Sequence, residues 1–226
     1  QRFPLYEKPT VDQNIEFFAG IYGLEAERLA ARRAFVLDMA GLRGRESTLT
    51  GALSGGWRQR LAFGCAILHE PSIVFLDEPT GGVDPVSRRQ SWVLIDDLAH
   101  RGVTVLVTTH YLDEAEHCHR IAMIQAGKLA ALGTVSELKG LFAGRRILEV
   151  RTPQPVQAMR VLDAMPGIAR TSIFGTALHA VTTSEDTSPA DIAAQLRAAG
   201  LDDASCAIVS PSLEDVFLDV AERSAS

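Results

Sequence analysis

The first part of the chain carries apolar residues at helical spacing, interrupted by residues that start or end helices. Thr10, followed three residues later by Gln13, forms a capping-box pattern. Pro71 ends a later apolar stretch, because proline cannot continue a helix without losing a backbone hydrogen bond. The pattern predicts helices from Thr10 to about Tyr22, from Glu25 to Ala40 and from Ser54 to about His69.

Two continuous apolar runs then alternate with helical patterns. Ile73–Leu76 and Val103–Val107 have the length and composition of parallel strands buried on both faces, and Val86–His100 between them is helical. A short helix over Tyr111–Cys118 and a hairpin follow. The hairpin pairs residues 121–124 with 129–132. This alternation predicts an α/β core with a parallel sheet.

A different pattern begins near Arg145. Its order is β-α-β-β-α-β, which predicts a small α+β, ferredoxin-like module. The expected elements are strands over 147–150, 168–174, 177–182 and 207–209, with helices over 155–165 and 189–199. A last helix, from Ser212 to about Ala221, places apolar residues on one face. That face either caps the module or contacts a partner.

Composition narrows the class of protein. Hydrophobic residues make up 46% of the 226 residues and charged residues 22%, as in folded domains. A net charge of -6 argues against a nucleic-acid partner, because phosphate binding needs basic patches. Three widely spaced cysteines favour free thiols in the cytosol over a disulfide framework.

Asp77 and Glu78 are the strongest candidates for chemistry. They follow an apolar strand, and ligands bind at the carboxyl ends of strands in open α/β sheets. One carboxylate can hold Mg²⁺ through water, while the other orients or deprotonates an attacking water. Solvated acids at a strand end are the alternative interpretation.

Other residues suit contact with an anion. Ser54, Gly55 and Gly56 precede a helix whose free N–H groups and positive end attract negative charge, although such a sequence also serves as an ordinary N-cap. Asp84 caps a helix ahead of Pro85, and His110 ends a strand. The His117-Cys118-His119 run is not expected to bind a metal, because adjacent helical residues do not share a face.

Four segments together resemble the nucleotide-binding domain of ABC-type ATPases. They are Leu53–Arg60 (the signature), Ile73–Thr80 (Walker B), Gly82–Pro85 (the D-loop) and Thr108–His110 (the H-loop). Gln1, with the segment to Tyr6, resembles the Q-loop. Trp57 replaces the glutamine often found in the signature. The likeness covers about Gln1 to Lys139.

The resemblance assigns roles to these residues. Asp77 and Gln1 would serve Mg²⁺, and Glu78 and His110 would act on water and the γ-phosphate of ATP. Gln1, Ser54, Gly55, Gly56 and Asp84 would contact nucleotide, the signature residues reaching ATP held by a second, head-to-tail nucleotide-binding domain. The predicted fold is a partial P-loop NTPase-like core with a helical signature subdomain over 1–144, plus the accessory module over 145–226.

No Gly-x-x-x-x-Gly-Lys-Ser/Thr phosphate loop occurs in the chain. The chain therefore resembles a domain whose first part precedes Gln1, and we expect these residues alone to be inactive.

Pro211–Leu218 resembles the carboxyl-terminal motif of ATPases that serve ABC-2-type exporters. This implies ATP-driven efflux with a membrane permease, at the cytoplasmic face of the cell membrane. Two alternatives remain: an ABC ATPase that acts on ribosomes or DNA, and an inert truncated cassette.

Overall fold

The computed structural model describes residues 5–225 and divides the chain into two compact units, Gln1–His110 and Tyr111–Ser226. Each unit is described by itself. Among the described residues, every helix is too short or too polar to cross a bilayer.

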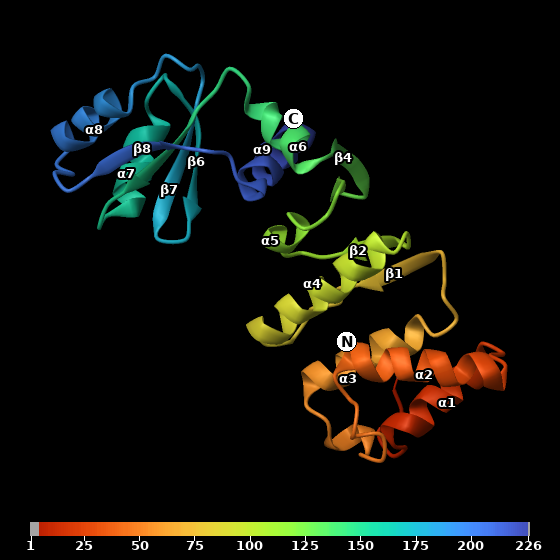
Figure 1. Ribbon diagram of the computed structural model, residues 1–226. Helices are drawn as coiled ribbons and strands as arrows, with labels where there is room; N and C mark the ends of the chain where they lie inside the picture. Colours follow the sequence, from red (N-terminus) through yellow and green to blue (C-terminus); the bar gives the residue numbers. More distant parts are fainter. Residues whose placement is uncertain (1–4, 226) are drawn as a thin grey trace. The chain divides into compact units, whose positions relative to one another are not determined.

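Helices dominate the first part of unit 1 (Figure 1). They are α1 (Val11–Ile21), α2 (Ala26–Ala40), the short 3₁₀ helix η1 (Thr50–Ala52) and α3 (Gly55–Ala66). The predicted capping box is present: Gln13 N–H donates to Thr10 Oγ1 and Thr10 N–H to Gln13 Oε1. Val11, Ile15, Leu37 and Leu61 belong to the core that joins the three α-helices.

The α/β part of unit 1 contains β1 (Ile73–Asp77), α4 (Pro85–His100) and β2 (Thr104–Thr108). The strands pair in parallel, as predicted, with Asp77 opposite Thr108. The expectation that both faces of these strands are buried is wrong. Phe75 is 74% exposed and Leu106 55%, because α3 and α4 supply apolar cover only to the face with Val74.

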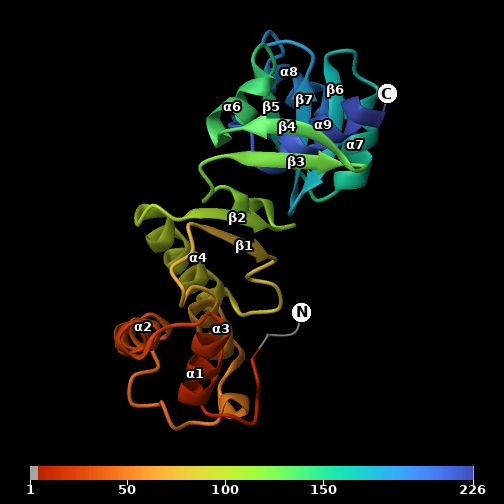
Figure 2. The same ribbon diagram turned by 90° about the vertical axis from the view of Figure 1, so that its right-hand side faces the viewer.

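Unit 2 begins with α5 (Leu112–Ala115), shorter than the helix predicted over Tyr111–Cys118. The antiparallel hairpin of β3 (Ile121–Gln125) and β4 (Lys128–Gly133) follows and is as predicted (Figure 2). The next elements are α6 (Val135–Lys139), which opens with a capping box from Thr134, and the 3₁₀ helix η2 (Gly140–Phe142).

A four-stranded sheet forms the rest of unit 2. Its strands are β5 (Ile147–Arg151), β6 (Ile168–Phe174), β7 (Ala177–Thr182) and β8 (Ser205–Val209). The strand order is β6-β7-β5-β8, all antiparallel, which is the ferredoxin-like arrangement expected for a β-α-β-β-α-β pattern. Helices α7 (Pro155–Asp163) and α8 (Pro189–Ala198) join one face of this sheet in a single core.

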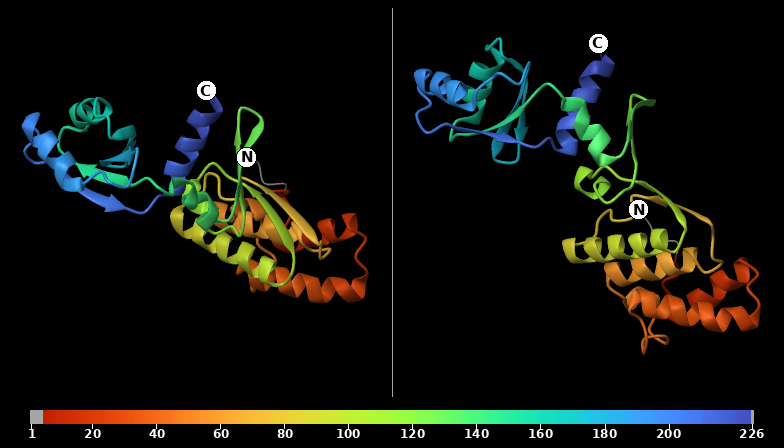
Figure 3. Two further views of the ribbon diagram at one scale, coloured as in Figure 1. Left: turned by 90° about the horizontal axis from the view of Figure 1, so that it is seen from above. Right: turned by 45° about the horizontal axis from the view of Figure 1, so that its top comes forward.

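The last helix, α9 (Leu213–Ala225), links the sheet to the hairpin. Leu213, Val216 and Val220 are buried in one core with residues of the hairpin, α6 and the sheet. Figure 3 shows α9 beside α6 in both views. The apolar face of α9 is therefore covered within unit 2. The boundary between the ATPase part and the accessory module, expected between residues 144 and 145, stays a prediction. The core that α9 shares with the hairpin and the sheet contains residues from both sides of that boundary.

Candidate functional site

The carboxyl ends of β1 and β2 place two carboxylates side by side. Asp77 is the last residue of β1, and Glu78 follows it with a φ of 43°, in the left-handed region. Non-glycine residues adopt this region rarely, and such strain concentrates at functional sites. The turn after β1 therefore presents two consecutive carboxylates at one strand end, where each can take a different role.

Thr108 fixes both of these residues. Its hydroxyl donates to Asp77 Oδ1, and it also lies 3.3 Å from the Glu78 amide nitrogen, which donates to the Thr108 carbonyl at 3.0 Å. Sequence reasoning gave Thr108 no role beyond its place in a motif. Parallel register could have indicated it, because the last residues of β1 and β2 face each other.

His110 completes the first group of site residues. Its Nδ1 lies 3.2 Å from Glu78 Oε1, and the side chains are 59% and 43% exposed respectively. An imidazole in hydrogen-bond contact with a carboxylate is held in one orientation and tautomer. Both groups remain open to water and to an approaching phosphate.

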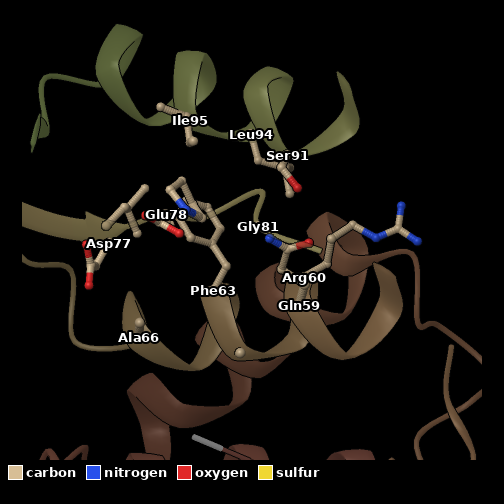
Figure 4. Close-up of a pocket in the computed structure, with 13 residues that line it drawn as sticks. Gln59, Arg60, Phe63, Ala66, Asp77, Glu78, Gly81, Ser91, Leu94 and Ile95 are labelled. Atoms are coloured by element: carbon tan, nitrogen blue, oxygen red, sulfur yellow. The ribbon is translucent and has the colours of Figure 1, made fainter. Parts of the chain in front are cut away.

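A cleft of about 430 Å³ lies beside the carboxylates (Figure 4). In the figure Asp77 and Glu78 stand at the end of β1, with Phe63 and Gln59 on the α3 side and Ile95 on the α4 side. The cleft places largely apolar walls behind Glu78, and low-polarity surroundings strengthen electrostatic interactions.

The predicted anion site lies at the amino end of α3. Ser54 is the N-cap residue, and in the described chain its side chain makes no capping hydrogen bond, so its hydroxyl is available to a ligand. Gly55 and Gly56 begin the helix. Trp57 packs against the helical core, and the Arg45 guanidinium stacks 4.0 Å from its ring centroid. The Trp57 departure from the family pattern thus contributes packing and a cation–π contact.

Asp84 is the N-cap of α4, as predicted. Its Oδ1 accepts from the Val86 and Ser87 amides, both at 3.0 Å, and its Oδ2 accepts from Ser87 Oγ at 2.7 Å. The hydrogen bond from the Ser87 hydroxyl is the main reason that the pKa of Asp84 lies below its ordinary value. This exposed carboxylate is therefore charged at neutral pH.

Gln1 lies outside the described residues, and its assignment stays a prediction. The segment that follows is held by Asn14, a buried residue of α1 that sequence reasoning missed. Asn14 Oδ1 accepts from the Tyr6 amide at 3.0 Å, and Asn14 Nδ2 donates to the Tyr6 carbonyl at 2.9 Å. Asn14 is polar, and the prediction of this helix rested on the spacing of apolar residues. The sequence pattern therefore did not indicate that the Asn14 side chain is buried.

The residues present suit Mg²⁺ bound together with a nucleotide. Mg²⁺ keeps several waters and takes one or two carboxylates plus phosphate oxygens, rather than an all-protein cage. Asp77, which accepts a hydrogen bond from the Thr108 hydroxyl, could supply one such carboxylate. Among the described residues, no cluster of three or more His, Cys, Asp or Glu side chains able to hold a metal occurs.

The two strand-end carboxylates, the histidine and the glycine-led helix lie in the segments by which the chain resembles the nucleotide-binding domain of ABC-type ATPases. A profile of the family described as "ABC transporter" matches residues 1–81. The chain is 36% identical over 216 residues to the Nod factor export ATP-binding protein I of Burkholderia pseudomallei (strain 1710b), with 95% of this chain and 68% of that protein covered. The chain belongs to the ATP-binding proteins of the ABC transporter family.

Other relatives agree. The chain is 30% identical over 231 residues to the linearmycin resistance ATP-binding protein LnrL of Bacillus subtilis (strain 168), covering 99% of this chain and 73% of that protein. It is 48% identical over 139 residues to the "Probable multidrug ABC transporter ATP-binding protein YbhF" of Escherichia coli (strain K12). That alignment covers 62% of this chain and 24% of YbhF, so the chain matches about a quarter of that relative's length.

Solved structures show the same fold. The structure titled "Structure of ATP binding subunit of ABC transporter" matches with a TM-score of 0.54 and 28% identity, over 62% of this chain and 58% of that chain. CbiO1 of Clostridium perfringens, described as part of the ABC transporter complex cbiONQ, matches with a TM-score of 0.55 and 25% identity, over 62% and 57%. The α/β core with a helical signature subdomain is therefore that of ABC ATPases.

Proposed function

We propose that this chain forms part of an ATP-binding and ATP-hydrolysing subunit of an ABC-2-type exporter. One observation carries the proposal: Asp77, Glu78 and His110 meet at the ends of β1 and β2, with Thr108 binding the first two. Sequence relatives named for multidrug transport, Nod factor export and drug resistance support the export class. The names of these relatives refer to different cargoes. We therefore define the cargo of this chain only as a lipophilic or polymeric compound.

The reaction is transfer of the γ-phosphoryl group of MgATP to water. Asp77 holds the Mg²⁺ of the substrate, with Gln1 as a second contact. Glu78 orients the attacking water and accepts its proton, while His110 contacts the γ-phosphate and holds Glu78 in place. Catalysis of this kind comes from positioning and electrostatics, because phosphoryl transfer requires little covalent chemistry from the protein.

A second nucleotide-binding domain completes the site. Ser54, Gly55 and Gly56 bind the γ-phosphate of ATP held by the other subunit, through the free N–H groups of α3 and the Ser54 hydroxyl. Asp84 reaches across in the same direction. Two subunits thus close head to tail on ATP, and closure drives transport. The phosphate loop that this requires is absent from the 226 residues, so hydrolysis belongs to the complete protein.

The surface beside Tyr6 suits a permease at the cytoplasmic face of the membrane. Tyr6 is 53% exposed and Phe17 45%, and their rings meet edge to face with centroids 4.9 Å apart. They border a shallow cleft with Gln13 and Glu16. Asn14 anchors this segment, so an apolar surface directly follows the residue assigned to the nucleotide site. A permease helix seated there would respond to closure.

Co-purification with the permease tests this assignment of function. In the complete protein, Phe17→Glu should abolish retention of the permease and stop ATP-driven uptake of cargo into inverted membrane vesicles, while basal ATP hydrolysis by the isolated subunit persists. Val93→Glu places the same charge on an exposed valine of α4 and is the matched control. Equal retention of the permease by both variants contradicts the docking surface, whereas absence of ATP hydrolysis in the unmodified complete protein contradicts the proposed activity.

A further inference from the structure

Gly56 lies against Ser87, where the first turns of α3 and α4 meet. A Cβ added at Gly56 would overlap Ser87 Oγ and lie 3.1 Å from Ser87 Cβ. At the neighbouring Gly55, an added Cβ would meet nothing within 4 Å. The two signature glycines therefore differ, because only Gly56 is required by an intramolecular contact.

The Ser87 hydroxyl cannot rotate away from Gly56 without loss. It donates to Asp84 Oδ2 at 2.7 Å, and the Ser87 amide donates to Asp84 Oδ1 at 3.0 Å. A side chain at position 56 would displace the hydroxyl and break its bond to the Asp84 carboxylate. Hydrogen bonds to charged groups are stronger than those between neutral groups, so this displacement has a cost.

A second contact fixes how the two helices meet. One turn further along each helix, Arg60 Nη1 donates to Gln90 Oε1 at 2.7 Å. Within α4, Ser91 Oγ donates to the Ser87 carbonyl at 3.0 Å. The contact of Gly56 with Ser87 is thus part of a paired surface of α3 and α4, rather than an isolated approach.

We propose that Ser87 is a positioning residue that links the signature loop to the D-loop of the same chain. It contacts Gly56 on one side and holds the Asp84 carboxylate on the other. A displacement at Gly56 reaches Asp84 through the Ser87 hydroxyl, and the two loops that face a partner subunit move together. The importance of this link for transport rests on the proposed function, but the link itself does not.

A double-mutant cycle in thermal unfolding of the 226-residue chain tests the link without nucleotide. Gly55→Ala should raise or preserve the melting temperature, because alanine favours a helix over glycine. Gly56→Ala should lower it by about 2–6 °C relative to Gly55→Ala, as expected for loss of one or two hydrogen bonds in a chain of this size. Adding Gly56→Ala to Ser87→Gly should have no such cost, since the obstructing atoms are gone.

Asp84→Ala separates a relay from a local clash. In that background the Ser87 hydroxyl has no hydrogen bond to the residue 84 side chain that could be lost. Gly56→Ala should therefore lower the melting temperature by at most half as much as it does in the parent chain. An equal cost in both backgrounds overturns the relay, and equal melting temperatures of Gly55→Ala and Gly56→Ala overturn the contact itself.

The functional arm uses the complete protein with Glu78→Gln, which should hold an ATP-bound dimer. Gly56→Ala should weaken this dimer at least tenfold, and adding Ser87→Gly should restore part of that loss. If Gly56 serves only the phosphate, the unfolding cycle shows no coupling and Ser87→Gly restores nothing, which overturns the proposal. If the unfolding cycle shows coupling but no variant dimerises with ATP, the proposed function fails and the link between the two loops stands.

Discussion

His110 Nδ1 lies 3.2 Å from Glu78 Oε1, so the histidine and the carboxylate that we assign to water activation are in direct contact. Glu78 adopts a left-handed backbone conformation at this point, and Thr108 accepts a hydrogen bond from its amide. The three residues come from the ends of two parallel strands. The contact therefore depends on strand register. A substitution in β2 should change the position of the Glu78 side chain although Glu78 itself is unchanged.

Thr108→Val should impair hydrolysis in the complete protein. It removes the hydroxyl that donates to Asp77 while keeping the size and the β-branched shape of the side chain. Loss of a hydrogen bond to a charged group is worth about 1.5–3 kcal/mol, which corresponds to roughly a 10–150-fold lower rate if the group acts in the transition state. Steady-state phosphate release at several Mg²⁺ concentrations measures the effect, which should include a higher Mg²⁺ requirement.

Thr108→Ser is the matched control, because it keeps the hydroxyl. It should retain most of the rate and the parent Mg²⁺ dependence. If valine and serine behave alike, Thr108 does not act through its hydroxyl, and its role is confined to packing in β2.

Stability should fall in acid because of Asp215. Burial raises the pKa of this carboxyl, but hydrogen bonds from His179 and Ser212 outweigh burial, and the pKa lies below its ordinary value. A carboxyl with a lowered folded-state pKa stabilises the fold above its unfolded pKa of about 3.9, and this stability is lost as pH falls through the folded-state pKa. Melting temperature should therefore decline below about pH 4.

Asp215→Asn should remove part of that decline and destabilise the chain at pH 7 by about 1.5–3 kcal/mol, the usual worth of a hydrogen bond to a charged group. Asp202→Asn, at an exposed position in the same unit, controls for the loss of one negative charge. Equal stability of the two variants at pH 7 contradicts the structural role of the His179–Asp215 pair, whose Nδ1 and Oδ1 atoms are 2.9 Å apart.

A chain ended at Gly144 should be less stable than one in which residues 146–210 are replaced by a Gly/Ser linker. Ending at Gly144 removes Leu213, Val216 and Val220 from the core of the hairpin, and each buried aliphatic side chain contributes about 1.5–3 kcal/mol. The linker variant keeps α9 and the contact of Arg145 with Asp219 at 2.8 Å. Soluble yield and circular dichroism melting distinguish them. Equal melting of both variants would show that α9 does not support the hairpin.

Cys65 should resist thiol reagents in the native chain. Burial raises its pKa to about 12, so almost no thiolate, the reactive species, is present at pH 8. Mass spectrometry after timed exposure to a thiol reagent should show Cys118 modified before Cys65, since Cys118 is partly exposed and Cys65 is buried. Cys65 should react only as urea unfolds the helical core. Equal native rates for both cysteines contradict the packing of α3.

Local signals in the sequence predicted the helices well, because their starts depend on side chains near in sequence. Thr10 with Gln13, and Asp84 ahead of Pro85, make the capping bonds that their types predict. The apolar runs of β1 and β2 predicted strands correctly but burial incorrectly. Exposure of Phe75 depends on what packs against the sheet, and an apolar run carries no information about that.

Roles that depend on contacts across the fold were not predictable. Thr108 reaches Asp77 only through the pairing of β1 with β2, and Ser87 meets Gly56 only where α3 and α4 approach. The motif identified Asp77, Glu78, His110 and Gly56 as candidates. It did not identify Thr108 or Ser87, because no spacing rule relates residues about 30 apart in the chain.

Glu78→Gln in the complete protein tests the central claim most directly. The amide keeps the size of the side chain but cannot accept the proton of water, so hydrolysis should fall by roughly 10²–10⁴-fold. ATP binding should persist through Asp77. Size-exclusion chromatography should then show a dimer with ATP and a monomer with ADP, and Ser54→Arg in the same background should abolish the dimer by placing bulk at the amino end of α3. Hydrolysis at the parent rate by Glu78→Gln would contradict the assignment of Glu78, and a lower rate with no ATP-dependent dimer would contradict the head-to-tail site.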